Sequence, residues 1–132
     1  MGADLKLLLD THALLWTLSA SSKLSSKARQ AIADLENERL VSAVSAMEIT
    51  TKYRLGKLPE AEFLAPDFIG ALAAYDYAPL PISIAHAARA GALAFAHGDP
   101  FDRILIAQAE IEGALLVSNE RLFDAFGVQR LW

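Results

Sequence analysis

An uninterrupted apolar segment that ends on a carboxylate constrains this chain more than any other feature. Residues 5–10 read LKLLLD, so Asp10 follows a run of leucines. A short continuous apolar run, without polar alternation, is typical of a strand that is buried on both faces. In an open parallel sheet, ligands gather at the carboxyl ends of the strands. We therefore expect Asp10 to lie at the edge of a buried sheet, where the core meets a functional site.

Strand patterns alternate with helix patterns along most of the chain. The clearest helix begins at Asp99 and Pro100 and ends at Gly113, because an acidic cap, an N-terminal proline and a terminal glycine are helix boundary signals. We expect strands at 5–10, 39–44, 77–83, 115–119 and 128–132. We expect helices at 12–19, 25–37, 45–58, 60–76 (with a break at Pro66), 84–96, 99–114 and 120–126. This alternation predicts a layered α/β fold with a mostly parallel sheet.

Length and composition narrow the class of protein further. The chain has 132 residues, 54% of them hydrophobic and 21% charged, which predicts one folded domain over residues 1–132. No cysteine is present, so disulfides, thiol nucleophiles and cysteine-ligated zinc are excluded, and a reducing cytoplasm fits. A signal peptide is not expected, because the sequence opens on a strand-like segment without a charged n-region or a cleavage site. A membrane span is not expected, because His86, Arg89 and His97 interrupt the apolar stretches.

Acidic side chains follow the predicted strands, at the junctions with the next helices. The polar residues at these junctions are Asp10, Glu48, Asp99, Asp102, Asn119 and Glu120. Clustered carboxylates repel one another unless a cation joins them, and ligand sets made only of oxygen suit Mg²⁺ or Mn²⁺. Such a metal would also attract a polyanionic substrate to a chain whose net charge is −4. The joint pattern therefore indicates a metal site for phosphodiester chemistry.

Each acid taken alone also has a simpler interpretation. Ser45 and Glu48 match a capping box, with Ser45 at the N-cap and Glu48 at the third helical position. Asp99 and Asp102 fit an acidic N-cap and first turn, which favour the helix dipole. Asp10 could be a turn residue at the end of a strand. The residues alone leave both interpretations open.

Neighbouring polar residues are weaker candidates for contact with a substrate. His12 stands two residues after Asp10 and either contacts substrate or packs locally at a helix start. Ser118 either orients an acid or caps a helix. Other candidates for substrate contact are Thr11, Lys52, Arg103 and Asn119. For the two basic residues, the alternative to phosphate contact is salt bridging on a solvated face.

Four segments, in order, resemble one known family. They are LLLDTHALLW (7–16), VSAVSAMEITTKYRLGKL (41–58), DPFDRILIAQAEIEGALLVS (99–118) and FGVQRLW (126–132). Together they resemble the PIN-domain family, and more closely the VapC ribonuclease toxins of type II toxin–antitoxin modules. The resemblance implies an α/β/α sandwich with a parallel sheet, and a pocket of acids that binds Mg²⁺ or Mn²⁺.

The resemblance also assigns roles to individual residues. Asp10 matches the first acid of the family pocket, Glu48 the second and Asp102 the third, with Asp99 as an additional acid one turn away. Where the family often has a T-x-D motif, this chain has SNE, so that Ser118 replaces threonine and Glu120 replaces aspartate. The implied activity is metal-dependent cleavage of RNA, in which Asp10, Glu48 and Asp102 hold the cation.

The same resemblance implies partners, and two rival functions stay open beside it. The implied partners are an RNA substrate, a cognate antitoxin protein and a second copy of the chain, in the cytoplasm and without a membrane. A phosphatase-like enzyme could use Asp10 as a nucleophile, because strand-end aspartates also serve that chemistry. A non-catalytic interaction module would use the acids only as helix caps.

Overall fold

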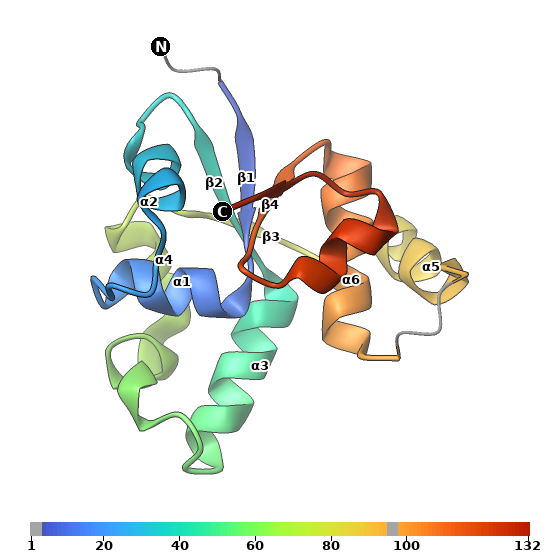
Figure 1. Ribbon diagram of the computed structural model, residues 1–132. Coiled ribbons are helices and arrows are strands. Elements are labelled where there is room, and N and C mark those ends of the chain that lie inside the picture. Colours follow the sequence, from blue (N-terminus) through green and yellow to red (C-terminus); the bar gives the residue numbers. More distant parts are fainter. Residues whose placement is uncertain (1–3, 95–97) are drawn as a thin grey trace.

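A five-stranded parallel sheet forms the centre of the molecule (Figure 1). The structure is a computed structural model, and it describes residues 4–94 and 98–132. The strands are β1 (Lys6–Leu9), β2 (Glu38–Ser42), β3 (Ala78–Leu80), β4 (Leu115–Val117) and β5 (Arg130–Leu131). Their order is β3-β2-β1-β4-β5, and each neighbouring pair is parallel. The predicted parallel α/β architecture is confirmed.

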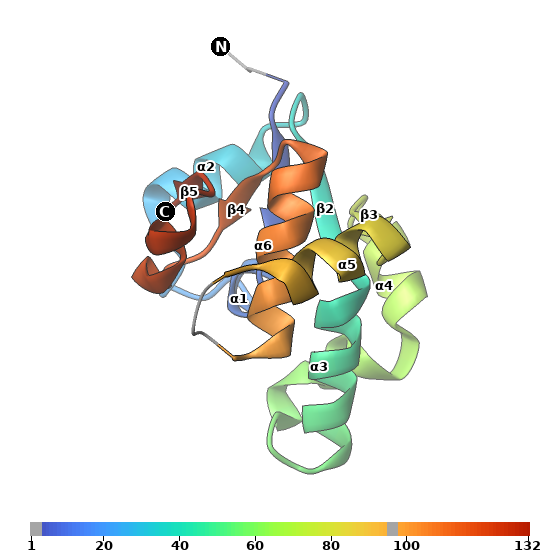
Figure 2. The same cartoon turned by 90° about the vertical axis from the view of Figure 1, so that its right-hand side faces the viewer.

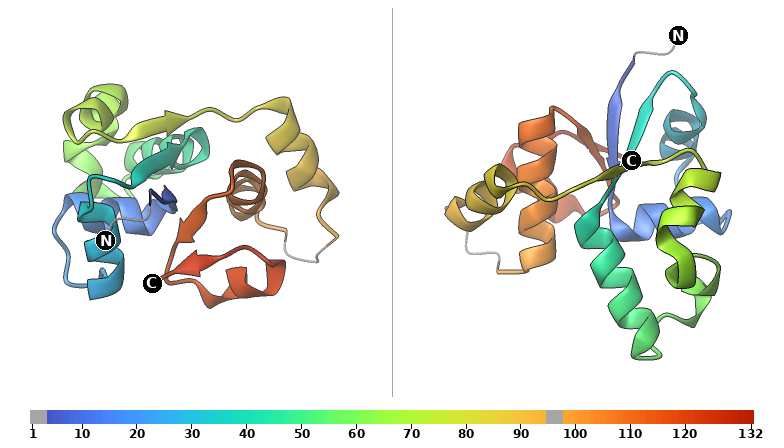
Figure 3. Two further views of the ribbon diagram at one scale, coloured as in Figure 1. Left: turned by 90° about the horizontal axis from the view of Figure 1, so that it is seen from above. Right: turned by 180° about the vertical axis from the view of Figure 1, so that it is seen from behind.

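Helices cover both faces of this sheet, which gives an α/β/α sandwich (Figure 3). The helices are α1 (Thr11–Leu18), α2 (Ser26–Ala33), α3 (Ala43–Arg54), α4 (Phe68–Ala74), α5 (Ile84–Ala92) and α6 (Pro100–Glu112), with 3₁₀ helices η1 (Pro59–Phe63), η2 (Ala65–Asp67) and η3 (Arg121–Phe126). One face packs against α1, α2, α4 and η1, and the other against α6 and η3. Helix α5 lies across α6 on the outside of that second layer (Figure 2).

Strand β1 is buried on both faces, as its continuous apolar sequence predicts. Leu7 and Leu9 belong to the core on the α1 side, whereas Leu8 belongs to the core on the α6 side. All three side chains are fully buried. Alternate residues of a strand point to opposite faces, so a strand that is covered on both sides has no position for a polar side chain until it ends.

Several predicted helices differ in type or extent; α2, for example, ends at Ala33 and not at residue 37. Residues 60–76 contain η1, η2 and α4 instead of one broken helix, and Pro66 lies in η2, where its missing N–H and its ring oppose a continuous α-helix. Residues 120–126 form the 3₁₀ helix η3. Helix α5 ends at Ala92, and residues 95–97, which include His97, lie outside the described ranges.

The order of the strands reverses beside β1. The chain passes from β1 through β2 to β3 on one side, and then returns to place β4 on the other side of β1. Open α/β sheets bind ligands at the carboxyl ends of the strands at such a reversal point. Asp10 lies at this point, because it directly follows β1 and its backbone N–H donates to the carbonyl of Val117 in β4 (3.1 Å). Among the described residues, no helix is long and apolar enough to cross a membrane.

Candidate functional site

Asp10 ends strand β1 and begins helix α1. Its backbone is extended, and its Oδ1 accepts a hydrogen bond from the N–H of Ala13 (2.8 Å), so Asp10 is the N-cap of α1. An N-cap aspartate satisfies one of the free donors of the first helical turn. Its side chain is nonetheless buried, with 6% of the residue exposed. Burial goes beyond what a cap requires, since a cap on the surface would serve equally well.

Burial also sets the electrostatics of Asp10. Desolvation raises the pKa of its carboxyl group. Hydrogen bonds from Ser118 and from the N–H of Ala13, together with the nearby His12, offset part of this rise, and the charge of Glu120 adds to it. In the described part of the chain, Asp10 has no ion pair with lysine or arginine. The ionised carboxylate is therefore short of positive charge, and a bound cation would supply it.

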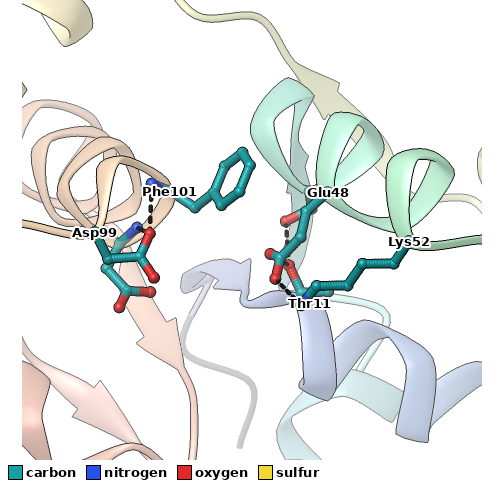
Figure 4. Close-up of polar contacts among 7 residues, drawn as sticks. Thr11, Glu48, Lys52, Asp99 and Phe101 are labelled. Carbon is teal, nitrogen blue, oxygen red and sulfur yellow. Dashed lines mark hydrogen bonds and ion pairs between the residues drawn. The ribbon is translucent and has the colours of Figure 1, made fainter. Parts of the chain in front are cut away.

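Glu48 reaches the same edge of the sheet from helix α3. The Thr11 hydroxyl donates to Oε1 of Glu48 (2.7 Å) and lies 3.3 Å from Oγ of Ser45, while Nζ of Lys52 lies 2.7 Å from Oε2 of Glu48 (Figure 4). Because Thr11 directly follows Asp10, its hydrogen bond holds Glu48 close to the end of β1. Both Glu48 oxygens have partners, and Lys52 now provides the positive charge that a metal would provide.

The predicted capping box at Ser45 and Glu48 is wrong. Helix α3 begins at Ala43, two residues earlier than expected, and its N-cap is Ser42, whose side chain accepts from the N–H of Val44. Ser45 is instead fully buried against Thr11. Ser45 and Glu48 are three residues apart and share one helix face, which allows both to contact Thr11.

Asp99 and Asp102 head helix α6 at the same end of the sheet (Figure 1). Asp99 is exposed, and its Oδ1 accepts from the N–H groups of Phe101 (2.9 Å) and Asp102 (3.4 Å), so the predicted N-cap is confirmed. In Figure 4, Asp99 and Phe101 lie across from Glu48. Within residues 4–94 and 98–132, no three acidic or histidine side chains are grouped closely enough to hold a metal ion.

The other candidate residues differ in their surroundings. His12 is exposed and stacks on Trp16, with ring centroids 5.3 Å apart. Ser118 is fully buried; its Oγ contacts Asp10 and accepts from the N–H of Glu120 (3.0 Å), so it is not a helix N-cap. Asn119 and Glu120 are exposed beside it.

Arg103 connects helix α6 to helix α5 through its guanidinium group. Its guanidinium donates to the backbone carbonyls of Ala90 (3.0 Å) and Leu93 (2.6 Å) at the C-terminal end of α5. Carbonyl groups at a helix end lack intrahelical partners, and a guanidinium satisfies them well. Arg103 therefore ties α5 to the helix that carries Asp102.

We predict that Thr11→Val destabilises the protein by about 1–2 kcal/mol, because valine keeps the shape of threonine and removes the hydrogen bond to buried polar partners. Thr11→Ser keeps the hydroxyl and should recover most of that loss. Urea unfolding of the three proteins at neutral pH measures the difference. Equal stabilities for the valine and serine variants would show that the hydroxyl contacts of Thr11 contribute nothing.

The chain was compared with protein-family models, curated protein sequences and solved structures. A family model described as PIN domain matches residues 7–128. No curated protein sequence matches the chain. Among solved structures, the chain is similar to VapBC2 from Rickettsia felis bound to a promoter DNA fragment (16% identity, 96% of each chain covered, TM-score 0.69) and to DNA-bound VapBC from Salmonella typhimurium (19%, 96% of each, 0.62). It is also similar to a toxin–antitoxin complex from Klebsiella pneumoniae (20%, 87% of each, 0.54). These identities establish a shared fold.

Proposed function

This chain belongs to the PIN domain family, and from that premise we propose that it is an endoribonuclease that hydrolyses RNA phosphodiester bonds with Mg²⁺ or Mn²⁺. The resemblance seen in the sequence to the PIN family is confirmed by the family match over residues 7–128. The observation that carries the proposal is Asp10, a buried carboxylate at the reversal point of the sheet whose burial raises its pKa. A folded chain retains such a costly charge where the charge has a task.

The chemistry of the donors fits a hard cation, but no three acidic or histidine side chains of the described residues are close enough to share one as they stand, so the carboxylates would have to move closer when an ion binds. Asp10, Glu48 and Asp102 would hold the ion through carboxylate oxygens, with Asp99 and Glu120 completing or tuning the site. Glu48 would exchange its contact with Lys52 for the metal, since the Lys52 ammonium now pairs with one of its oxygens. A half-exposed pair of this kind contributes at most about 1 kcal/mol, so the exchange costs little.

The residues of the chain itself would orient the reaction. When bound, the metal lowers the pKa of a water molecule and stabilises the charge that develops on the phosphate. Thr11 holds one oxygen of Glu48, and Ser118 holds the carboxylate of Asp10. These fixed hydrogen bonds limit the motion of the two carboxylates, which is what a preorganised site requires.

We further propose that the chain is the toxin of a cytoplasmic toxin–antitoxin module, and that it forms a homodimer and binds a cognate antitoxin. Two observations support this. The structural neighbours are described as VapBC and toxin–antitoxin complexes. Large apolar side chains such as Met47, Ile69 and Ile84 are exposed on the single chain, and a partner would cover them.

The direct test is cleavage of single-stranded RNA by the purified chain with Mg²⁺, Mn²⁺ or EDTA. We expect cleavage with either metal and none with EDTA. We also expect Mn²⁺ to bind to the wild-type chain and to bind at least tenfold more weakly to Glu48→Gln, which lacks one carboxylate ligand. A chain that neither cuts RNA nor binds Mn²⁺ while correctly folded would reject the proposal.

One observation favours a non-catalytic interaction module as the second candidate. Asp10 and Asp99 are both genuine helix N-caps. That interpretation leaves the burial of Asp10 unexplained, and it predicts intact folding without metal binding. The phosphatase-like alternative predicts that a phosphate mimic, beryllium fluoride, labels Asp10 and that RNA stays intact.

A further inference from the structure

A cavity beside the acidic site is lined by aromatic and basic side chains that the proposed metal site does not use. The cavity has a volume of about 210 Å³ and lies between α1 and η1, and we call it the α1 pocket. The residues that matter here are His12, Trp16, Lys23, Leu58, Glu60 and Phe63. Ligand pockets for drug-sized molecules measure about 300–1,000 Å³, so the α1 pocket suits a single ring system.

Two stacked rings form the aromatic wall of the α1 pocket: Trp16, which packs against the core, and His12, which is exposed. His12 stacks on Trp16 with 12° between the ring planes, and Trp16 in turn contacts Trp132 at 5.8 Å between ring centroids. Trp16 is half-buried and packs against the core, whereas His12 is exposed. A ring that entered the pocket would therefore meet an aromatic stack that is already ordered, with little loss of side-chain freedom.

Positive charge lies on the aromatic side of the pocket. Nζ of Lys23 lies 5.8 Å from the centre of the Trp16 ring, whereas the carboxylate that lines the pocket, Glu60, lies on η1. Proteins that bind single-stranded nucleic acid combine positive charge along the backbone with aromatic side chains on which the bases stack. The α1 pocket has both components next to the proposed site of cleavage.

We propose that the α1 pocket binds one base of the single-stranded RNA substrate, from a nucleotide close to the phosphate at the acidic site. This inference rests on the proposed function. Helix α1 advances about 1.5 Å per residue, so Trp16 lies roughly 6 Å along the helix from His12. His12, which lines the pocket, is two residues from Asp10 in the sequence, so a base in the pocket and a phosphate at the acidic site would belong to the same stretch of RNA.

Glu60 makes the inference more specific. Its carboxylate is exposed at the pocket and is a hydrogen-bond acceptor. Guanine presents two adjacent donors, N1–H and its exocyclic amino group, which a carboxylate accepts together, whereas uracil presents only N3–H. The pocket should therefore prefer guanine over uracil, and Glu60→Gln should weaken that preference.

The chain offers an internal probe, because Trp16 and Trp132 are its two tryptophans and both belong to this stack. The experiment titrates full-length Asp10→Asn protein, which should bind RNA without cutting it, with short single-stranded RNAs and follows tryptophan fluorescence. We expect quenching by RNA and binding about tenfold weaker when the pocket nucleotide is abasic. His12→Ala and Phe63→Ala should each weaken binding by about tenfold, since stacking on an aromatic ring contributes about 1–3 kcal/mol per base.

A charge variant with a matched control separates phosphate attraction from general charge effects. Lys23→Ala should reduce the slope of log affinity against log salt concentration by about one, because one fewer counterion is released on binding. Lys27→Ala removes an equally exposed lysine that does not line the pocket, and it should leave binding unchanged.

Failure of this inference can be told apart from failure of the proposed function. If wild-type protein cuts RNA while His12→Ala, Phe63→Ala and abasic RNA leave the affinity unchanged, the base pocket is rejected and the nuclease stands. If base-dependent quenching occurs and wild-type protein cuts no RNA, the pocket stands and the nuclease is rejected. If Phe63→Ala turns a dimer into monomers in sedimentation without altering RNA affinity, the pocket is a protein interface and the inference is overturned.

Discussion

Asp10→Asn should reduce metal-dependent RNA cleavage by on the order of 100-fold or more, and should also make the metal-free protein more stable at neutral pH. Asparagine keeps the oxygen that caps α1 at Ala13 and removes the negative charge. Because burial raises the pKa of Asp10, the folded state binds its proton more tightly than the unfolded state does. The charge of Asp10 therefore lowers stability as the pH rises from the unfolded pKa through the folded pKa.

Unfolding by denaturant at two pH values checks the sign. Well below the unfolded pKa of about 3.9, both states carry a neutral Asp10, and wild type and Asp10→Asn should be similarly stable. At pH 7 the variant should be the more stable protein without metal, and added Mn²⁺ should stabilise wild type only. Asp10→Ala is the matched control, because it also removes the cap and should be about 1 kcal/mol less stable than Asp10→Asn. An asparagine variant that cuts RNA at the wild-type rate would remove Asp10 from the mechanism.

Leu8→Ala and Leu9→Ala should each destabilise the protein by about 2–5 kcal/mol, a large share of the roughly 5–15 kcal/mol that holds a typical domain together. The two leucines are adjacent in β1 and fully buried, and they belong to cores on opposite faces of the sheet. In a sheet covered on one side only, one of the two substitutions would be nearly neutral. Large losses at both positions are the signature of the sandwich.

Urea unfolding of both variants measures these losses. Leu35→Ala provides the control, because Leu35 is 82% exposed and its truncation should change stability by less than about 0.5 kcal/mol. A loss below about 0.5 kcal/mol for either Leu8→Ala or Leu9→Ala would mean that one face of β1 is less covered than the structure shows.

Parts of the candidate site were visible in the sequence, and parts were not. The position of Asp10 at a strand end and the cap at Asp99 follow from neighbouring residues, and both are confirmed. The contact between Thr11 and Glu48 joins residues 37 positions apart, and no local pattern predicts it. The hydrogen bonds that Arg103 donates to carbonyl groups at the end of α5 are likewise contacts between two helices that no local pattern predicts.

The sequence by itself determined the elements and their class. An apolar run without alternation, a proline at a helix start and a glycine in the left-handed conformation at Gly113 each act within a few residues, so they can be recognised before folding is known. Only the tertiary structure decided the strand order, the burial of Asp10, the pairing of Glu48 with Thr11 and the stacking that opens the α1 pocket. These depend on the packing of helices on the sheet, because side chains far apart in sequence come within hydrogen-bonding distance only after the strands take their places.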